Sequence, residues 1–395
     1  MRALTRNPLI LPVYLPTFIL SFGQGILLPI LPVFAKSFGV SYAWIGWVLA
    51  GESIGTLVGD LPAGMLMRKM GRKTVMVAGV TLVSLSVLAL FFSQSIYQVV
   101  LYRFLAGFGN ALWNISRLVY LADATQSHQR GRAIALYGGT SRIGSFLGPG
   151  IGGVLAGYFT LKTPFLFYAG LAGIGIITSI LFVENTSSGS HTIRKTARGH
   201  LFAVIKAQYW TLLTAGSGQL CAQTVRTGRN IILPLYGPDI LGLDIQTIGW
   251  IMSAASFVDM SLFYPAGLIM DRLGRKYVSV PSFTIQAIGV GLIPFTEGFL
   301  GLLLAALLIG LGNGLSSGAM MTLGADLAPK DATGEFLAAW RLVGDGGRMG
   351  APVAVGQIAD ILGLTPATLV IASFGVLAST IFALLVPETL QKPPS

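Results

Sequence analysis

Charged residues are scarce in this sequence. Only 10% of its 395 residues are Asp, Glu, Lys or Arg, whereas a soluble domain carries about 25%. Hydrophobic residues make up 53%, and the mean hydropathy is +0.73. A chain of this length could fold as two or three soluble domains, but it has too few polar residues to cover their surfaces. We therefore expect an all-α integral membrane protein, and its 51 glycines suit helices that pack closely in lipid.

Cysteine and histidine are also rare. The single cysteine, Cys221, excludes an intrachain disulfide and a metal site built from several cysteines. The three histidines fall in polar stretches, at His128, His191 and His200. The sequence also lacks the G-x4-G-K-[ST] loop that binds nucleotide phosphates. We expect no metal, no cofactor and no enzymatic activity.

Long apolar runs divide the chain into segments that could each cross a bilayer as a helix. About 20 apolar residues are enough for one crossing. The predicted spans are 9–35, 42–66, 74–93, 96–121, 133–158, 163–183, 208–236, 246–269, 277–296, 299–325, 335–361 and 365–387. They predict an N-terminal six-helix bundle (1–183), a mobile cytoplasmic linker (184–207) and a C-terminal six-helix bundle (208–395).

The distribution of Lys and Arg predicts the orientation. Most Lys and Arg residues outside the predicted spans lie on one side of the membrane, together with both termini and the linker. Only Lys36 and Lys162 lie on the other side. Because cytoplasmic loops carry the excess of Lys and Arg, we expect both termini in the cytoplasm and the chain in the inner (plasma) membrane. The net charge of +11 then reflects topology and not a nucleic-acid partner.

The two halves of the chain are related by an internal repeat. Residues 61–75 (LPAGMLMRKMGRKTV) match residues 264–278 (YPAGLIMDRLGRKYV) at eight of fifteen positions, with an offset of 203. The same offset carries Asn110 onto Asn313 and Pro149 onto Pro352. Two bundles of common origin are expected to enclose a midplane binding site at their interface.

Three motifs identify a family that the chain resembles. They are Gly267-x3-Asp271-Arg272-x-Gly274-Arg275-Lys276, Arg103-x3-Gly107-x-Gly109, and Gly144-x3-Gly148-Pro149-x2-Gly152-Gly153. Through these motifs the chain resembles the major facilitator superfamily, and most closely its drug:proton antiporters. The third motif departs from the family pattern at its first glycine, which Ala135 replaces. The resemblance implies a monomeric transporter in a lipid bilayer, with a small-molecule substrate and protons as its partners.

Ionisable residues inside the spans are expensive to bury, so they usually line a pathway or pair with one another. We expect Arg142 to pair with Asp259. Glu52 lies at a depth similar to that of Asp345 and Arg348, so we expect these residues to be its partners. Arg341, Asp345 and Arg348 fall at i, i+4 and i+7, on one helical face. These pairs are either structural bridges or proton-coupling groups, and the coupling candidates are Glu52, Asp259, Asp345, Arg103 and Arg142. Arg117 is expected to extend to the membrane interface.

In the resembled fold, the first, fourth, seventh and tenth spans line the substrate cavity. The residues that they offer are Gln24, Asn110, Trp113, Arg226, Arg229 and Asn313. Such a set is largely apolar with few polar anchors, as ligand pockets usually are, although Asn110 and Asn313 could instead only bond neighbouring helices. The first span has no acid and arginines outnumber acids in the spans, which favours an anionic or neutral substrate.

These features predict export of small amphipathic molecules, drug-like or organic anions, by alternating access with proton antiport. The alternative is an uncoupled or importing transporter of a small organic anion.

One departure from the family pattern predicts how the gate closes. Arg68 stands where the second half has Asp271, and Arg132 is related by the 203 offset to Glu335. Arg132 with Asp271 and Arg68 with Glu335 would both be attractive pairs. We expect them to latch the cytoplasmic gate; otherwise these residues are only topological loop charge.

Charge reversal tests the latch. Arg68→Asp should impair transport because it faces Glu335 with a second acid, and adding Glu335→Arg should restore an attractive pair and the flux. Transport in proteoliposomes measures both steps. A double variant as impaired as Arg68→Asp alone would show that these two residues do not pair.

Overall fold

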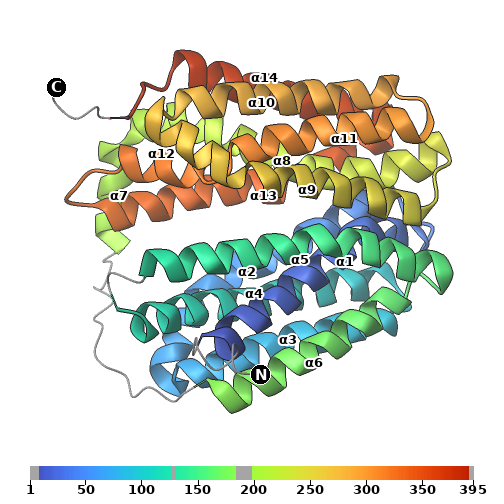
Figure 1. The fold of residues 1–395 in the computed structure, drawn as a ribbon, viewed down its shortest axis with the longest axis horizontal. Helices are drawn as coiled ribbons and strands as arrows, with labels where there is room; N and C mark the ends of the chain where they lie inside the picture. The colour runs from blue at the N-terminus through green and yellow to red at the C-terminus, as the bar shows by residue number, and fades with distance from the viewer. Residues whose placement is uncertain (1–8, 127–129, 184–197, 391–395) are drawn as a thin grey trace. The chain divides into compact units, whose positions relative to one another are not determined.

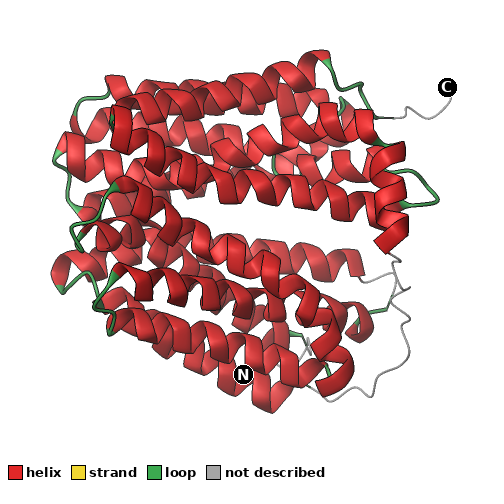
Figure 2. Ribbon diagram, turned by 180° about the vertical axis from the view of Figure 1, so that it is seen from behind, coloured by secondary structure: helices red, strands yellow, loops and turns green. Residues whose placement is uncertain are grey.

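The computed structural model describes residues 9–126, 130–183 and 198–390. Every element in this part of the chain is a helix, and short loops connect the helices (Figure 1, Figure 2). The all-α class predicted from hydropathy is confirmed.

The described helices follow the predicted spans closely. The N-terminal half contains a five-residue π-helical turn (Ile10–Tyr14) and then α1 (Leu15–Lys36), α2 (Tyr42–Met70), α3 (Arg72–Phe91), α4 (Ile96–Ala124), α5 (Arg130–Tyr158) and α6 (Thr163–Phe182). The rest contains α7 (Arg198–Ala207), α8 (Tyr209–Leu241), α9 (Ile245–Arg272), α10 (Lys276–Leu292) with a 3-10 turn (Ile293–Phe295), α11 (Gly298–Leu315), α12 (Ala319–Leu327), α13 (Thr333–Leu362) and α14 (Leu364–Leu384).

Two features differ from the prediction. Residues 198–207, in the segment predicted as a linker, form helix α7, while 184–197 lie outside the described residues. The predicted span 299–325 is interrupted between α11 and α12, where Gly318 takes a positive φ of 80°. A left-handed residue cannot continue a right-handed helix, and glycine adopts that conformation without steric cost.

The most apolar helices are distinct from those that carry most of the buried charge. By length and composition, seven spans of the described chain are apolar enough to cross a membrane, among them α3, α6 and α14. The long helices outside that group are α2, α4, α5, α8 and α13, and they hold most of the ionisable residues predicted within the spans. Their charges require partners inside the bundle.

The chain divides into two compact units. Unit 1 comprises Met1–His191 and Asp244–Ser253, and unit 2 comprises Thr192–Leu243 and Ala254–Ser395. The pairs of packed helices repeat between the units. In unit 1, α1 packs on α5 and α6, and α3 packs on α4 and α6; in unit 2, α8 packs on α13 and α14, and α10 packs on α11 and α14. The sequence repeat is therefore also a repeat of helix packing.

Glycines bring the helix backbones into contact at matching positions. A Cβ added to Gly107 would overlap the backbone carbonyl of Glu52, and a Cβ added to Gly310 would overlap that of Ala255. Both pairs differ by the same offset of 203. In lipid, small residues permit this close packing, which contributes much of the attraction between helices.

Two glycines on α2 test this packing. Gly55→Ala places a methyl group against the backbone carbonyl of Phe104, and overpacking of this kind costs about 1–3 kcal/mol. Gly64→Ala meets nothing within 4 Å, and alanine stabilises a helix interior by up to about 1 kcal/mol over glycine. We expect Gly55→Ala to lower the melting temperature in detergent and Gly64→Ala to keep or raise it. Equal melting temperatures would contradict the close approach at Gly55.

Candidate functional site

A carboxylate in unit 1 receives donors from two other helices. Glu52 on α2 forms an ion pair with Arg103 of α4. Asn110 Nδ2, also on α4, donates to Glu52 Oε1 at 2.7 Å, and Gln24 Nε2 of α1 donates to the same oxygen at 3.2 Å. Arg103 is only 7% exposed, so this carboxylate offsets the cost of burying its charge.

The spacing of α4 explains why this cluster forms. Arg103, Gly107 and Asn110 fall at i, i+4 and i+7, so they share one face of the helix. Gly107 in the middle lets α4 touch the backbone of α2 at Glu52. The two donors on either side of the glycine then reach the carboxylate.

The structure joins residues that the sequence assigned to different roles. Gln24 and Asn110 were expected in the substrate cavity, and Glu52 and Arg103 in proton coupling, yet all four form one network. The partners that the structure gives Glu52 lie on α1 and α4, and its expected pairing with Asp345 and Arg348 stays a prediction. Trp113 is 2% exposed and belongs to the core of unit 1.

Unit 2 holds a related arrangement, shifted by one helical turn. Asn313 Nδ2 donates to Asp259 Oδ2 at 2.8 Å, and Arg229 of α8 lies within electrostatic range of the same carboxylate. The repeat position of Asp259 is Thr56, whose hydroxyl donates to the Gly107 carbonyl at 3.1 Å. Asn110 and Asn313 thus bond neighbouring helices. The pairing of Asp259 with Arg142 stays a prediction.

The charged triad predicted on one face of α13 is confirmed. Asp345 Oδ2 lies 3.7 Å from Arg341 Nε, and its Oδ1 lies 3.3 Å from Arg348 Nη1. Asp345 is 17% exposed, whereas Arg341 and Arg348 are 58% and 52% exposed. Arg348 Nε also donates to Gln223 Oε1 on α8 at 3.3 Å.

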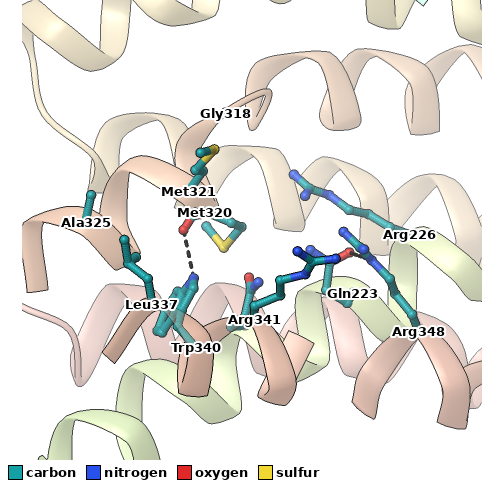
Figure 3. Close-up of a pocket in the computed structure, with 11 residues that line it drawn as sticks. Gln223, Arg226, Gly318, Met320, Met321, Ala325, Leu337, Trp340, Arg341 and Arg348 are labelled. Carbon is teal, nitrogen blue, oxygen red and sulfur yellow. Dashed lines mark hydrogen bonds between the residues drawn. The ribbon is translucent and has the colours of Figure 1, made fainter. Parts of the chain in front are cut away.

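A cavity of about 510 Å³ lies beside this triad, between α8, α12 and α13 of unit 2. Figure 3 shows arginines and Gln223 on one side of it and Trp340, Leu337 and Met320 on the other. The lining residues are Gln219, Gln223, Arg226, Gly318, Met320, Met321, Ala325, Leu337, Trp340, Arg341 and Arg348. Of these, the sequence singled out only the arginines, because glutamine, methionine and tryptophan on a helix carry no signal of a cavity.

Arg226 joins the cavity to the break between α11 and α12. Its Nη2 donates to the backbone carbonyl of Ser316 at 3.0 Å and also to the Ser316 hydroxyl. Its guanidinium lies over the ring of Phe283, 5.4 Å from the centroid. A cation at the C-terminal end of α11 interacts favourably with the helix dipole.

The glycine motif of α5 provides two packing faces within unit 1. Gly148 lies against Gly25 of α1, and Gly153 lies against Gly249 in the first turns of α9. Nearby, the hydroxyl of Ser253 accepts from the Gly150 N–H at 2.8 Å and donates to the Phe146 carbonyl at 2.7 Å. These two backbone groups are four residues apart and would bond each other in a regular helix, so Ser253 bridges the α5 ladder.

Matching ion pairs lie near the loop signature of each unit. Arg72 pairs with Asp123, and Arg275 Nε lies 2.8 Å from Asp326 Oδ2. Both pairs obey the 203 offset. Asp271 is 72% exposed and lies 4.0 Å from Arg275. Its expected partner Arg132, and the pairing of Arg68 with Glu335, stay predictions.

Arg117 differs from its prediction. It was expected to extend to the membrane interface, but it is 8% exposed and stacks over the Tyr137 ring, 3.8 Å from the centroid. The aromatic face of a helix neighbour offers a buried cation a partner that periodicity within α4 cannot predict.

The C-terminal segment caps α10. The Glu388 carboxylate accepts from the backbone N–H groups of Arg275 at 2.9 Å and of Lys276 at 3.0 Å. Gly274 has a φ of 122°, and a Cβ there would overlap this carboxylate. Thr389 Oγ1 donates to Asp326 Oδ2 at 2.8 Å. Glu388 and Thr389 thus bind the C-terminal segment to residues at the loop signature.

Desolvation alone would raise the pKa of Glu388, but backbone donors from Leu390, Arg275, Lys276 and Thr389 outweigh it and hold that pKa below its ordinary value. A carboxyl group with a lowered pKa stabilises the fold above its unfolded pKa, and this stabilisation disappears as pH falls through the folded pKa.

Glu388→Gln should therefore lower the melting temperature at pH 7, by the equivalent of about 0.5–1 kcal/mol for a lost helix cap. The difference from the wild type should shrink below about pH 4.3, the ordinary pKa of glutamate. Thermal unfolding of both proteins between pH 7 and pH 3.5 measures this. A difference that stays constant with pH would contradict the role of the ionised carboxylate.

The sequence of the chain is similar to those of known transporters. The sequence profile of the Major Facilitator Superfamily matches residues 13–223 and 215–395. An uncharacterised transporter of this type from Methanocaldococcus jannaschii is 23% identical over 356 residues, covering 89% of this chain and 91% of the relative. Multidrug resistance protein 2 of Bacillus subtilis is 26% identical over 308 residues, covering 74% of each chain.

A solved structure of the nucleoside transporter NupG is similar in fold, with a TM-score of 0.80 at 15% identity. The alignment covers 95% of this chain and 99% of that one.

Proposed function

Because the chain belongs to the Major Facilitator Superfamily and is a multi-pass membrane transporter, we propose that it exports small amphipathic molecules by proton antiport. The substrates would be drug-like compounds or organic anions, carried by alternating access across the plasma membrane, with both termini in the cytoplasm. The similarity to a multidrug resistance protein supports efflux. The observation that carries the coupling is the Glu52 network.

Glu52 is the carboxylate whose protonation would change most contacts. It accepts from Arg103, Asn110 and Gln24 of two other helices. A proton on Glu52 removes its negative charge, which weakens the attraction to Arg103 and takes up acceptor capacity that the two amides now use. The contacts of α2 with α1 and α4 would then loosen, so the proton would change the packing of unit 1.

The membrane potential can supply the required free energy. One proton moving down 100 mV releases about 2.3 kcal/mol, which corresponds to a concentration ratio of about fifty. The gate would be latched in the proposed cycle by Arg132 with Asp271 and by Arg68 with Glu335. Asp259 and Asp345 are the other acids that could carry the proton.

Substitution of Glu52 tests the coupling. In liposomes with an internal pH dye, addition of substrate should move protons in the wild type, and Glu52→Gln should abolish this movement because the amide cannot bind the proton. Glu297→Gln, which removes the same charge from an exposed site before α11, should behave as the wild type.

If Asp259→Asn or Asp345→Asn abolishes the proton movement while Glu52→Gln retains it, the proton site lies in unit 2. Substrate flux without proton movement in the wild type would contradict antiport and favour the second candidate function. That candidate is an uncoupled or importing transporter of a small organic anion, which the arginines around the unit 2 cavity favour.

A further inference from the structure

We propose that the unit 2 cavity is a binding site for amphipathic aromatic anions, with an acidic group held by Arg341 and Arg348 and an apolar ring against the wall that Leu337, Met321 and Trp340 line. This inference rests on the proposed function, since it names the substrate class of the transporter. It selects organic anions over cationic drugs.

The charge of the cavity is strongly positive. Within the described part of the chain, its lining includes three arginines and no acid. The nearest carboxylate of the triad, Asp345, is shared by Arg341 and Arg348. Both guanidinium groups are more than half exposed and so are accessible to a ligand. Guanidinium groups bind carboxylates with charge-assisted and often bidentate hydrogen bonds.

A buried amide beside the arginines also points to a ligand. Gln219 lines the cavity and is 6% exposed, yet its Oε1 has no hydrogen-bond partner among the described residues. Leaving a buried polar group unbonded costs about 1–3 kcal/mol. A glutamine amide has both a donor and an acceptor group, so it can donate to an acid or accept from a hydroxyl of a ligand.

The break in the helix adds to the preference for an anion. Helix α12 begins at the cavity, where Gly318, Met320 and Met321 belong to the lining. The first N–H groups and the dipole of a helix favour negative charge. Interrupted membrane helices of transporters present their N-terminal ends to anionic groups in this way.

The opposite wall is apolar: Leu337 and Met321 offer accessible surface, and Trp340 and Met320, each 4% exposed, support them. Trp340 Nε1 donates to the Met320 carbonyl at 3.0 Å, which fixes the indole, and Phe336 stacks on Trp340 at a centroid distance of 6.4 Å. Methionine adapts its shape to different ligands and makes favourable contacts with aromatic rings. A cavity of about 510 Å³ lies in the range that holds drug-sized ligands.

Asp345 is the internal competitor for the ligand. Its contacts of 3.3 and 3.7 Å to the two arginines are longer than the roughly 2.7–2.9 Å of strong charge-assisted bonds. An incoming carboxylate therefore competes with Asp345 for both groups. Removing the charge of Asp345 should strengthen anion binding, which is the opposite of the effect of removing either arginine.

Two probes with the same ring test the charge preference. The purified full chain in detergent is titrated with 1-pyrenebutyrate or with 1-pyrenebutylammonium, and the anisotropy of pyrene fluorescence gives the dissociation constants. Arg341→Gln and Arg348→Gln should each weaken pyrenebutyrate binding about tenfold, and Asp345→Asn should strengthen it several-fold. Lys330→Gln removes a positive charge from an exposed loop of the same unit and should leave both probes unchanged.

The remaining variants separate charge from folding. Arg341→Lys keeps the charge and should bind pyrenebutyrate more tightly than Arg341→Gln, at an unchanged melting temperature. Trp340→Phe should retain most binding of both probes. Equal pyrenebutyrate affinity in the wild type, Arg341→Gln and Arg348→Gln would overturn the inference, as would tighter binding of pyrenebutylammonium by the wild type.

Flux measurements distinguish this inference from the proposed function. Proton-coupled flux of pyrenebutylammonium, without anion binding that depends on Arg341, would overturn the anion site and leave antiport standing. Anion binding that Arg341→Gln weakens, without flux of either probe in proteoliposomes, would support the site and contradict the proposed transport.

Discussion

The cost of burying charge in an apolar helical protein governs the arrangement of both units. An unpaired ion loses several kcal/mol when it leaves water, so each internal arginine requires a carboxylate, a carbonyl or an aromatic face. Arg103 has Glu52, Arg226 has the Ser316 carbonyl and the Phe283 ring, and Arg117 has Tyr137. The helices that carry these residues must then approach one another closely enough for the partners to meet.

Glycine provides that approach, and this links the repeat to the chemistry. Gly107 brings Glu52 between Arg103 and Asn110, while Gly310 makes the equivalent contact in unit 2. The repeat preserves the packing but not the charge, because Ala255 occupies the position that corresponds to Glu52. In unit 2 the acid lies one turn further along α9, at Asp259, where Asn313 reaches it. A common backbone thus carries two different electrostatic arrangements.

Hydropathy and periodicity predicted the helices and the triad of α13, because both depend on local sequence. Spans of about 20 apolar residues must be helical in lipid, and residues at i, i+4 and i+7 must share a face. The break before α12, the bridge made by Ser253 and the cap made by Glu388 were not predicted. The bridge and the cap depend on contacts between residues that are distant in sequence, so no window along the chain contains the signal. The break is local to Gly318, but hydropathy does not report the backbone conformation of a glycine. The cavity was missed for the same reason as the bridge and the cap, since α8, α12 and α13 supply it together.

The contrast between the two carboxylate sites separates two tasks of the proposed cycle. Glu52 is balanced by one arginine and two amides, so a proton is the species that would alter its contacts most. Asp345 instead contacts two exposed arginines that lie beside an apolar wall. Protonation of Glu52 would change contacts among three helices, whereas exposed guanidinium groups suit an anionic ligand. The proton and the substrate would therefore bind in different units, and their coupling would have to pass through the motion of one unit against the other and not through competition for one residue.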